Sequence, residues 1–174
     1  RRIKKGQELT SERISALRQA LVNFVTAASI RRAQQMAAGQ PTKRYAMIVH
    51  IETSRSAHSW QHTVTDDIVH ALRRAIADSE PVADSLIAQS IADLKRSIEA
   101  AGLQMPVVPE IASEVKSAFT KGAVVTEKIN SDNQVENLLD DNAELKLRTP
   151  FNVFIGGQIL DRGITVPNLI GFYY

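Results

Sequence analysis

The last stretch of the sequence decides the fold: Pro150-Phe-Asn-Val-Phe-Ile-Gly-Gly-Gln-Ile-Leu-Asp-Arg-Gly-Ile-Thr-Val-Pro-Asn-Leu-Ile-Gly-Phe-Tyr-Tyr174. Two short apolar runs, at 152–155 and 169–174, flank a polar loop at 156–167. Short apolar runs bounded by turn residues are typical of strands covered on both faces of a parallel sheet. In open α/β sheets, ligands bind at the carboxyl ends of such strands. The stretch therefore predicts a strand, a candidate functional loop and a second strand.

The chain before this stretch alternates helical patterns with apolar runs. Apolar residues at spacings of three and four predict a long helix that ends near Gly39, and the run at 45–51 predicts a buried strand. Three further helices are predicted at 58–79, 82–101 and 110–121, followed by a strand at 123–130 and a long loop at 131–149. This order predicts an α/β fold with a largely parallel sheet flanked by helices, in which residues 58–121 form a helical insertion.

The composition is that of an ordinary globular protein of one domain, with 44% hydrophobic and 23% charged residues among 174. A net charge of +2 gives no strong field toward nucleic acid or an anionic membrane. The absence of cysteine excludes disulfides, cysteine-ligated zinc and thiol catalysis. No apolar run approaches the roughly 20 residues that span a bilayer, so we expect a cytoplasmic protein without membrane contact. We also expect the domain, residues 1–174, to be cut at both ends from a longer protein.

The loop of the final stretch offers side chains suited to phosphate. Gly156 and Gly157 follow a strand and permit close approach of a partner to the backbone. The loop then supplies an amide, a carboxylate, a guanidinium and a hydroxyl, from Gln158, Asp161, Arg162 and Thr165. Arginine binds two phosphate oxygens at once because its guanidinium is planar. The alternative is that the glycines shape a turn and that Asp161 and Arg162 form a solvated ion pair.

A second candidate segment, His50-Ile-Glu-Thr-Ser-Arg-Ser-Ala-His58, follows the first predicted strand. Ser54 and Arg55 could hold a phosphodiester backbone, and the N-terminus of the helix that follows favours anions. In the alternative interpretation the serines only cap the helix and Arg55 is exposed. His50 lies on an apolar strand, where a histidine is more often a hydrogen-bonded core residue than a ligand.

Other patterns give weaker signals. His58, His62 and Asp66 share a helical face, but such spacing is common by chance, so no metal site is predicted. Trp60 is predicted to be a packing residue. The sequence has no Gly-x-x-x-x-Gly-Lys-Ser/Thr phosphate loop, so the chain is not by itself a complete ATPase of that class.

Several segments together carry a family resemblance. The sequence from Phe154 to Tyr174, with its Gly-Gly-x-x-x-x-Arg-Gly-x-Thr core, resembles the signature of the "Z-one" domain family, whose members are proposed endonucleases. Four further segments also match that family: Tyr45-Ala-Met-Ile-Val-His50, Thr53-Ser-Arg55, Ile30-Arg-Arg32 and residues 124–131. The resemblance spans most of the chain.

That family in turn resembles the second RecA-like lobe of superfamily-two helicases. The resemblance implies that Arg162 and Asp161 are catalytic residues at an interface between lobes. It implies nucleic-acid contacts from Ser54, Arg55, Gly157 and Gln158, and nucleotide contacts from Gly163 and Thr165. Two positions depart from the helicase pattern, since Gly157 replaces a hydroxyl residue and Thr165 replaces an acid.

The resemblance implies the C-terminal RecA-like lobe of an ATP-dependent, helicase-like DNA-processing protein, in bacterial restriction or phage defence. Its partners would be DNA and an upstream RecA-like lobe. ATP and Mg²⁺ would act in the full-length protein, and the fragment alone would bind neither and be inactive. One alternative is a metal-dependent endonuclease that uses Asp161, Glu110 or the pair Asp140 and Asp141. Another is a non-catalytic interaction module in which residues 58–121 dock a partner.

Overall fold

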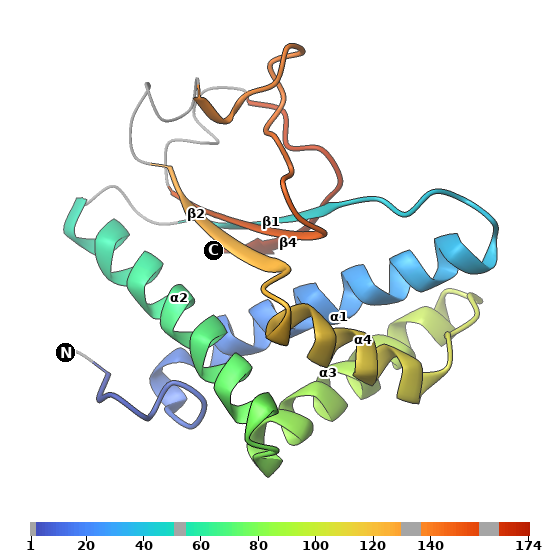
Figure 1. Ribbon diagram of the computed structural model, residues 1–174, viewed down its shortest axis with the longest axis horizontal. Coiled ribbons are helices and arrows are strands. Elements are labelled where there is room, and N and C mark those ends of the chain that lie inside the picture. Colours follow the sequence, from blue (N-terminus) through green and yellow to red (C-terminus); the bar gives the residue numbers. More distant parts are fainter. Residues whose placement is uncertain (1–2, 51–54, 130–136, 157–163) are drawn as a thin grey trace.

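The computed structural model describes residues 3–50, 55–129, 137–156 and 164–174, without the side chains of residues 55–59 and 61 (Figure 1). A short 3-10 turn, Glu12–Ile14, leads into helix α1. The helices are α1 (Ser15–Ala37), α2 (Arg55–Ala77), α3 (Pro81–Ala100) and α4 (Val108–Thr120). The strands are β1 (Tyr45–Val49), β2 (Val124–Lys128), β3 (Phe151–Ile155) and β4 (Leu169–Tyr173).

The four strands form one sheet in the order β2-β3-β1-β4. Every pairing is parallel, with Tyr45 opposite Phe151 and Val49 opposite Ile155 where β1 meets β3. The prediction of an α/β fold with a largely parallel sheet is therefore confirmed. The apolar runs predict it because strands covered on both faces need apolar side chains at consecutive positions, and β1 and β3 are buried throughout.

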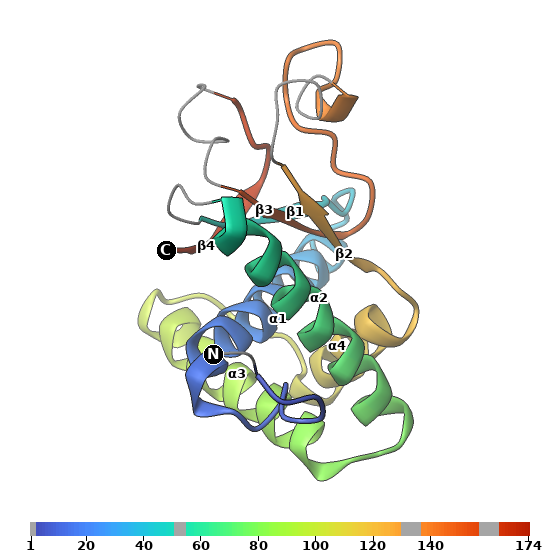
Figure 2. The same cartoon turned by 90° about the vertical axis from the view of Figure 1, so that its left-hand side faces the viewer.

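The helices form a layer on one face of the sheet, and the two views in Figures 1 and 2 show this layer below the strands. Alternate residues of β1 and β3, among them Met47, Val49 and Val153, pack into the same apolar core as the helices. Each helix contributes fully buried side chains, for example Leu21, Leu72, Ile87 and Phe119. The helical run predicted as an insertion lies between β1 and β2 and shares this core with α1.

The opposite face of the sheet is covered by the segments at 137–149 and 164–166 (Figure 1). Ala46, Phe154 and Ile129 point to this face and pack with Leu138 and Leu145 in a second, smaller core. Successive residues of β1 and β3 thus face opposite sides of the sheet, as the pleat of a strand requires.

The connection from β1 to β2 runs through the helical layer and passes beyond β3. Residues 137–149, which precede β3, and residues 164–166, which precede β4, pack on the opposite face of the sheet.

Helix α4 begins earlier than the sequence predicts. Residues 106–109 are expected to be an extended connector because they contain two prolines, yet α4 starts at Val108 and includes Pro109 in its first turn. Proline is tolerated there because the amide groups of a first turn have no partner inside the helix.

Candidate functional site

The carboxyl ends of β1, β3 and β4 lie at one edge of the sheet. The amide of Gly156 donates to the carbonyl of Val49 at 3.2 Å, and the amide of His50 donates to the carbonyl of Tyr173 at 2.8 Å. The two candidate segments of the sequence therefore leave neighbouring strands at the same edge, since one follows His50 and the other follows Gly156. Open α/β sheets bind ligands at this kind of edge.

Most of the predicted site residues lie outside the described part of the chain. These are Ser54, Gly157, Gln158, Asp161, Arg162 and Gly163. Arg55 is the first residue of α2, and the structure describes its backbone but not its side chain. Thr165 is exposed, and its carbonyl accepts the amide of Leu145 at 3.0 Å. Their roles remain predictions, while the strands that lead into both segments are placed side by side.

Gly156 is the residue on which the close approach at this edge depends. A Cβ atom at this position would lie 2.4 Å from the carbonyl oxygen of Ile129, the residue that follows β2. The amide of Ile129 donates to the carbonyl of Ile155 at 2.9 Å, which fixes the two strand ends together. The first glycine of the predicted loop is therefore required by backbone packing, before any ligand is considered.

His50 was expected to be a hydrogen-bonded core histidine, but its ring is only half-buried. Among the described residues, which omit 51–54, its buried Nδ1 atom has no hydrogen-bond partner. The ring stacks against Tyr174 at a centroid separation of 5.3 Å and against Phe172 at 6.4 Å. Phe172 remains half exposed, so the edge of the sheet beside β4 presents aromatic surface.

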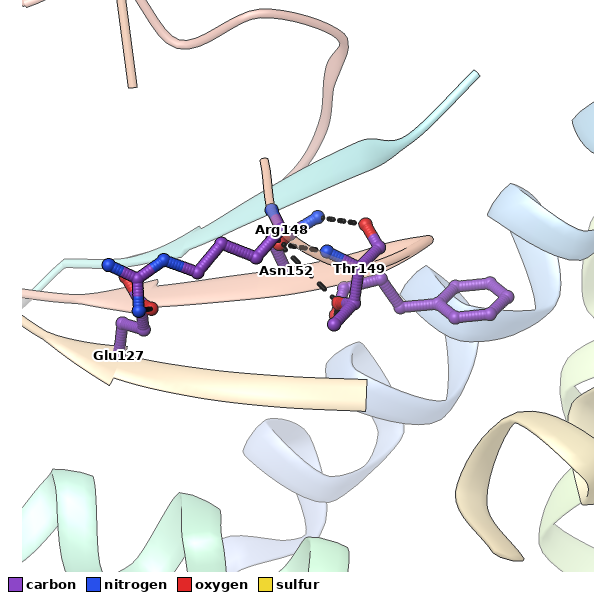
Figure 3. Close-up of polar contacts among 5 residues, drawn as sticks. Glu127, Arg148, Thr149 and Asn152 are labelled. Atoms are coloured by element: carbon purple, nitrogen blue, oxygen red, sulfur yellow. Dashed lines mark hydrogen bonds and ion pairs between the residues drawn. The ribbon is translucent and has the colours of Figure 1, made fainter. Parts of the chain in front are cut away.

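At the other end of β3, Asn152 organises the turn that precedes the strand (Figure 3). Its Oδ1 atom accepts the amides of Arg148 at 2.9 Å and Thr149 at 3.2 Å. Its Nδ2 group donates to the carbonyls of Thr149 at 2.6 Å and Tyr45 at 3.1 Å. Asn152 is buried, and these bonds join the start of β1 to the start of β3.

Beside this turn, Arg148 forms an ion pair with Glu127 of β2, with Nη1 and Oε1 3.1 Å apart (Figure 3). The Oε2 atom of Glu127 is buried and has no hydrogen-bond partner within the part of the chain that the structure describes. Sequence reasoning missed this pair because nothing in the sequence places residue 148 over β2. The signal available in the sequence was Glu127 itself, an acidic residue within a run that is otherwise typical of a strand.

The described residues give no support to a metal centre, because they contain no group of three or more histidine or acidic side chains that could hold an ion. Asp66 accepts a hydrogen bond from Oγ1 of Thr126 at 2.9 Å and lies 3.5 Å from Nε2 of His70. Its carboxylate thus ties α2 to β2. The side chain of His58 lies outside the described residues.

The described acids proposed for a nuclease do not converge either. Glu110 lies in the first turn of α4, in the helical layer, whereas Asp140 lies in the segment that covers the opposite face of the sheet. The Asp140 carboxylate accepts the amides of Asn142 and Glu144 at 2.9 and 3.0 Å, which is the bonding of a turn. Lys116 pairs with Asp84 of α3 at 2.7 Å. These residues stabilise the fold where they stand.

Within the described ranges, none of the helices combines the length and the apolar character needed to cross a bilayer.

Among known protein families, the model of the Z1 domain matches residues 16–174. This is the family written above as "Z-one". No match was found among curated proteins or among solved structures. The family match includes all four strands and both candidate segments.

Proposed function

Because this chain belongs to the Z1 domain family, and because its two candidate segments leave one edge of a parallel sheet, we propose that it is the second RecA-like lobe of an ATP-dependent, helicase-like protein that acts on DNA. The observation that supports this proposal most is the pairing of β1 with β3. The two strands are parallel and end together, with Val49 opposite Ile155. Ser54 and Arg55 therefore start from the same edge as the loop that holds Arg162.

In this proposal the residues after β1 hold the DNA backbone. Helix α2 begins at Arg55, so its N-terminal amides and its macrodipole favour a phosphate at that point. The guanidinium of Arg55 would add a bidentate contact to phosphate oxygens. Ser54, Gly157 and Gln158 would complete the contacts to the strand.

The residues after β3 would act on the nucleotide. Arg162 and Asp161 would face an adjoining nucleotide-binding lobe, and Gly163 and Thr165 would lie against the nucleotide. ATP and Mg²⁺ would be held mainly by that lobe, since this sequence has no phosphate loop of the Walker type. A cytoplasmic role in bacterial restriction or phage defence belongs to the same proposal.

The test is DNA-stimulated ATP hydrolysis by a protein that contains this domain next to a nucleotide-binding lobe. Arg162→Ala should abolish the stimulation, whereas Arg96→Ala on the exposed surface of α3 should not. Circular dichroism would verify that both variants keep the fold. Stimulated hydrolysis that survives Arg162→Ala would contradict the proposed role.

Metal-dependent cleavage of plasmid DNA by the 174-residue chain, lost on Asp161→Ala, would favour the endonuclease instead. Failure of the larger protein to bind either DNA or nucleotide would favour the interaction module.

A further inference from the structure

A cavity of about 800 Å³ lies between the N-terminal segment, residues 3–14, and one face of α2. This volume is within the range of ligand-binding pockets, roughly 300–1,000 Å³. The cavity belongs to the helical layer and is lined by both charged and apolar side chains. Thr165, the one proposed contact residue whose side chain the structure describes, is not among the residues that line it.

The N-terminal wall of this groove is fixed to the rest of the domain. Nη1 of Arg18 donates to the carbonyls of Glu8 and Ser11, at 3.3 and 3.0 Å. Leu9 and Ile14 are buried in the main core. The burial of Arg18 lowers its pKa, and the charge of Glu12 opposes this shift. The wall is therefore held by both apolar and polar contacts.

The opposite wall is a single stripe along α2. Its members follow one another at spacings of three and four residues, which places them on one helical face: Trp60, Thr63, Asp67, His70 and Arg74. At 1.5 Å per residue, the backbone from Trp60 to Arg74 spans about 21 Å. A stacked nucleic-acid strand rises about 3.4 Å per nucleotide, so this length corresponds to about six nucleotides. The groove is thus longer than a mononucleotide.

An aromatic surface and free cations line this groove. Trp60 was expected to be a packing residue, and it remains 40% exposed. Lys5 and Arg74 are exposed, and within the described residues neither has an acidic partner. Arg73 is partly engaged, since its Nε atom donates to the carbonyl of Phe119 at 3.0 Å. In sequence, four of the first five residues are basic: Arg1, Arg2, Lys4 and Lys5.

We propose that this groove binds single-stranded nucleic acid, with bases stacked on Trp60 and phosphates paired with Lys5 and Arg74. The inference deepens the proposed action on DNA and rests on it. An exposed aromatic ring together with exposed basic side chains is typical of a site that follows a single strand without reading its sequence.

An acidic side chain in the groove lets the proposal predict the direction in which the affinity for nucleic acid changes. Asp67 lies on the stripe between Trp60 and Arg74 and is exposed. Its carboxylate would repel a passing phosphate. Asp67→Asn should therefore tighten binding, whereas Arg74→Gln and Lys5→Gln should weaken it.

Trp60 also supplies the assay, because the chain contains a single tryptophan. Titration of the 174-residue chain with a six-nucleotide oligothymidine should quench its fluorescence. Anisotropy of a labelled oligothymidine would measure the affinity of every variant, including Trp60→Ala. We expect Trp60→Ala to weaken binding at least five-fold, since stacking on an aromatic side chain is worth about 1–3 kcal/mol per base. Arg74→Gln should reduce the salt slope by about 0.7, the value for one contact to a single strand.

Arg96→Gln is the matched control, because Arg96 lies on the exposed surface of α3 and pairs with Asp93. The groove proposal is contradicted if oligothymidine binds but leaves the tryptophan signal and the Lys5, Asp67 and Arg74 variants unchanged. If the groove variants change nothing while Arg55→Gln weakens binding, the groove proposal fails and the proposed DNA contact at the sheet edge survives. Absence of any DNA binding would contradict both. Quenching by an acidic peptide with equal affinity would also overturn the groove proposal in favour of a protein ligand.

Discussion

Gly156→Ala tests the packing that brings the two candidate segments to one edge. The added Cβ would lie 2.4 Å from the carbonyl oxygen of Ile129, whereas carbon and oxygen atoms in contact normally lie about 3.3 Å apart. The ends of β2 and β3 must therefore separate by about 0.9 Å. That movement would stretch the 2.9 Å bond between Ile129 and Ile155 beyond hydrogen-bonding distance.

The expected cost follows from these two effects. Overpacking costs about 1–3 kcal/mol, and the lost hydrogen bond costs about 1 kcal/mol. Alanine also lowers the conformational entropy of the unfolded chain, which offsets about 0.4–1 kcal/mol of this loss in stability. We expect the free energy of unfolding to fall by about 2–3 kcal/mol, which for a chain of this size lowers Tm by roughly 5–10 °C.

The assay is urea unfolding followed by circular dichroism, with Gly102→Ala as the control. Gly102, unlike Gly156, has no neighbour within 4 Å of an added Cβ, and its φ is +68°. Its substitution therefore isolates backbone strain, worth about 1–2 kcal/mol. If Gly156→Ala destabilises the domain no more than Gly102→Ala does, the strand ends are not in close contact and the reasoning is refuted.

Two further positions, Asn152 and Arg148, give predictions for the free energy of unfolding and for its dependence on pH. Asn152→Ala should lower the free energy of unfolding by about 3 kcal/mol, because buried amides and carbonyls lose their partners. Urea titrations would measure this loss, and a loss below about 1 kcal/mol would contradict the prediction. The carboxyl introduced by Asn152→Asp would face the carbonyls of Tyr45 and Thr149, which raises its pKa in the folded state. Relative to wild type, that variant should therefore be most stable at low pH and lose stability as the pH rises, and a loss on acidification would refute the account. Arg148→Gln should lower the free energy of unfolding by at most about 1 kcal/mol, since the side chain of Arg148 is 58% exposed. In a double-mutant cycle, Arg148→Gln should cost less in the Glu127→Gln background than in the wild type, because the ion pair is already broken there.

The sequence predicts the elements of this fold well because burial on both faces leaves a direct mark. The runs at Tyr45–Val49 and Phe151–Ile155 are apolar at consecutive positions, and both are buried strands of a parallel sheet. The helices appear as periodic patterns for the same reason, since one face of each packs in the main core. The start of α4 was misplaced by two residues, because proline fits a first turn as well as a connector, and α2 begins three residues earlier than predicted.

The relations between elements could not be predicted in the same way. Strand order depends on how far each crossover travels, and no local pattern records that β3 inserts between β2 and β1. The role of Asn152 depends on the carbonyl of Tyr45, a residue more than 100 positions away. Trp60 reads as an apolar residue in a helical pattern, and no local pattern shows that it is exposed beside the N-terminal segment. The structure places His50 and Gly156, from which the two candidate segments start, at one edge of the sheet.

The most direct test of the central claim is DNA binding at that edge. Fluorescence anisotropy should compare the wild-type chain with Arg55→Gln and with the control Arg96→Gln, over a series of salt concentrations. If the residues after β1 hold the DNA backbone, Arg55→Gln should weaken binding across sequences and reduce the salt slope by about 0.7–0.9, the contribution of one phosphate contact. Equal affinity and equal salt slope for Arg55→Gln and wild type would contradict the claim.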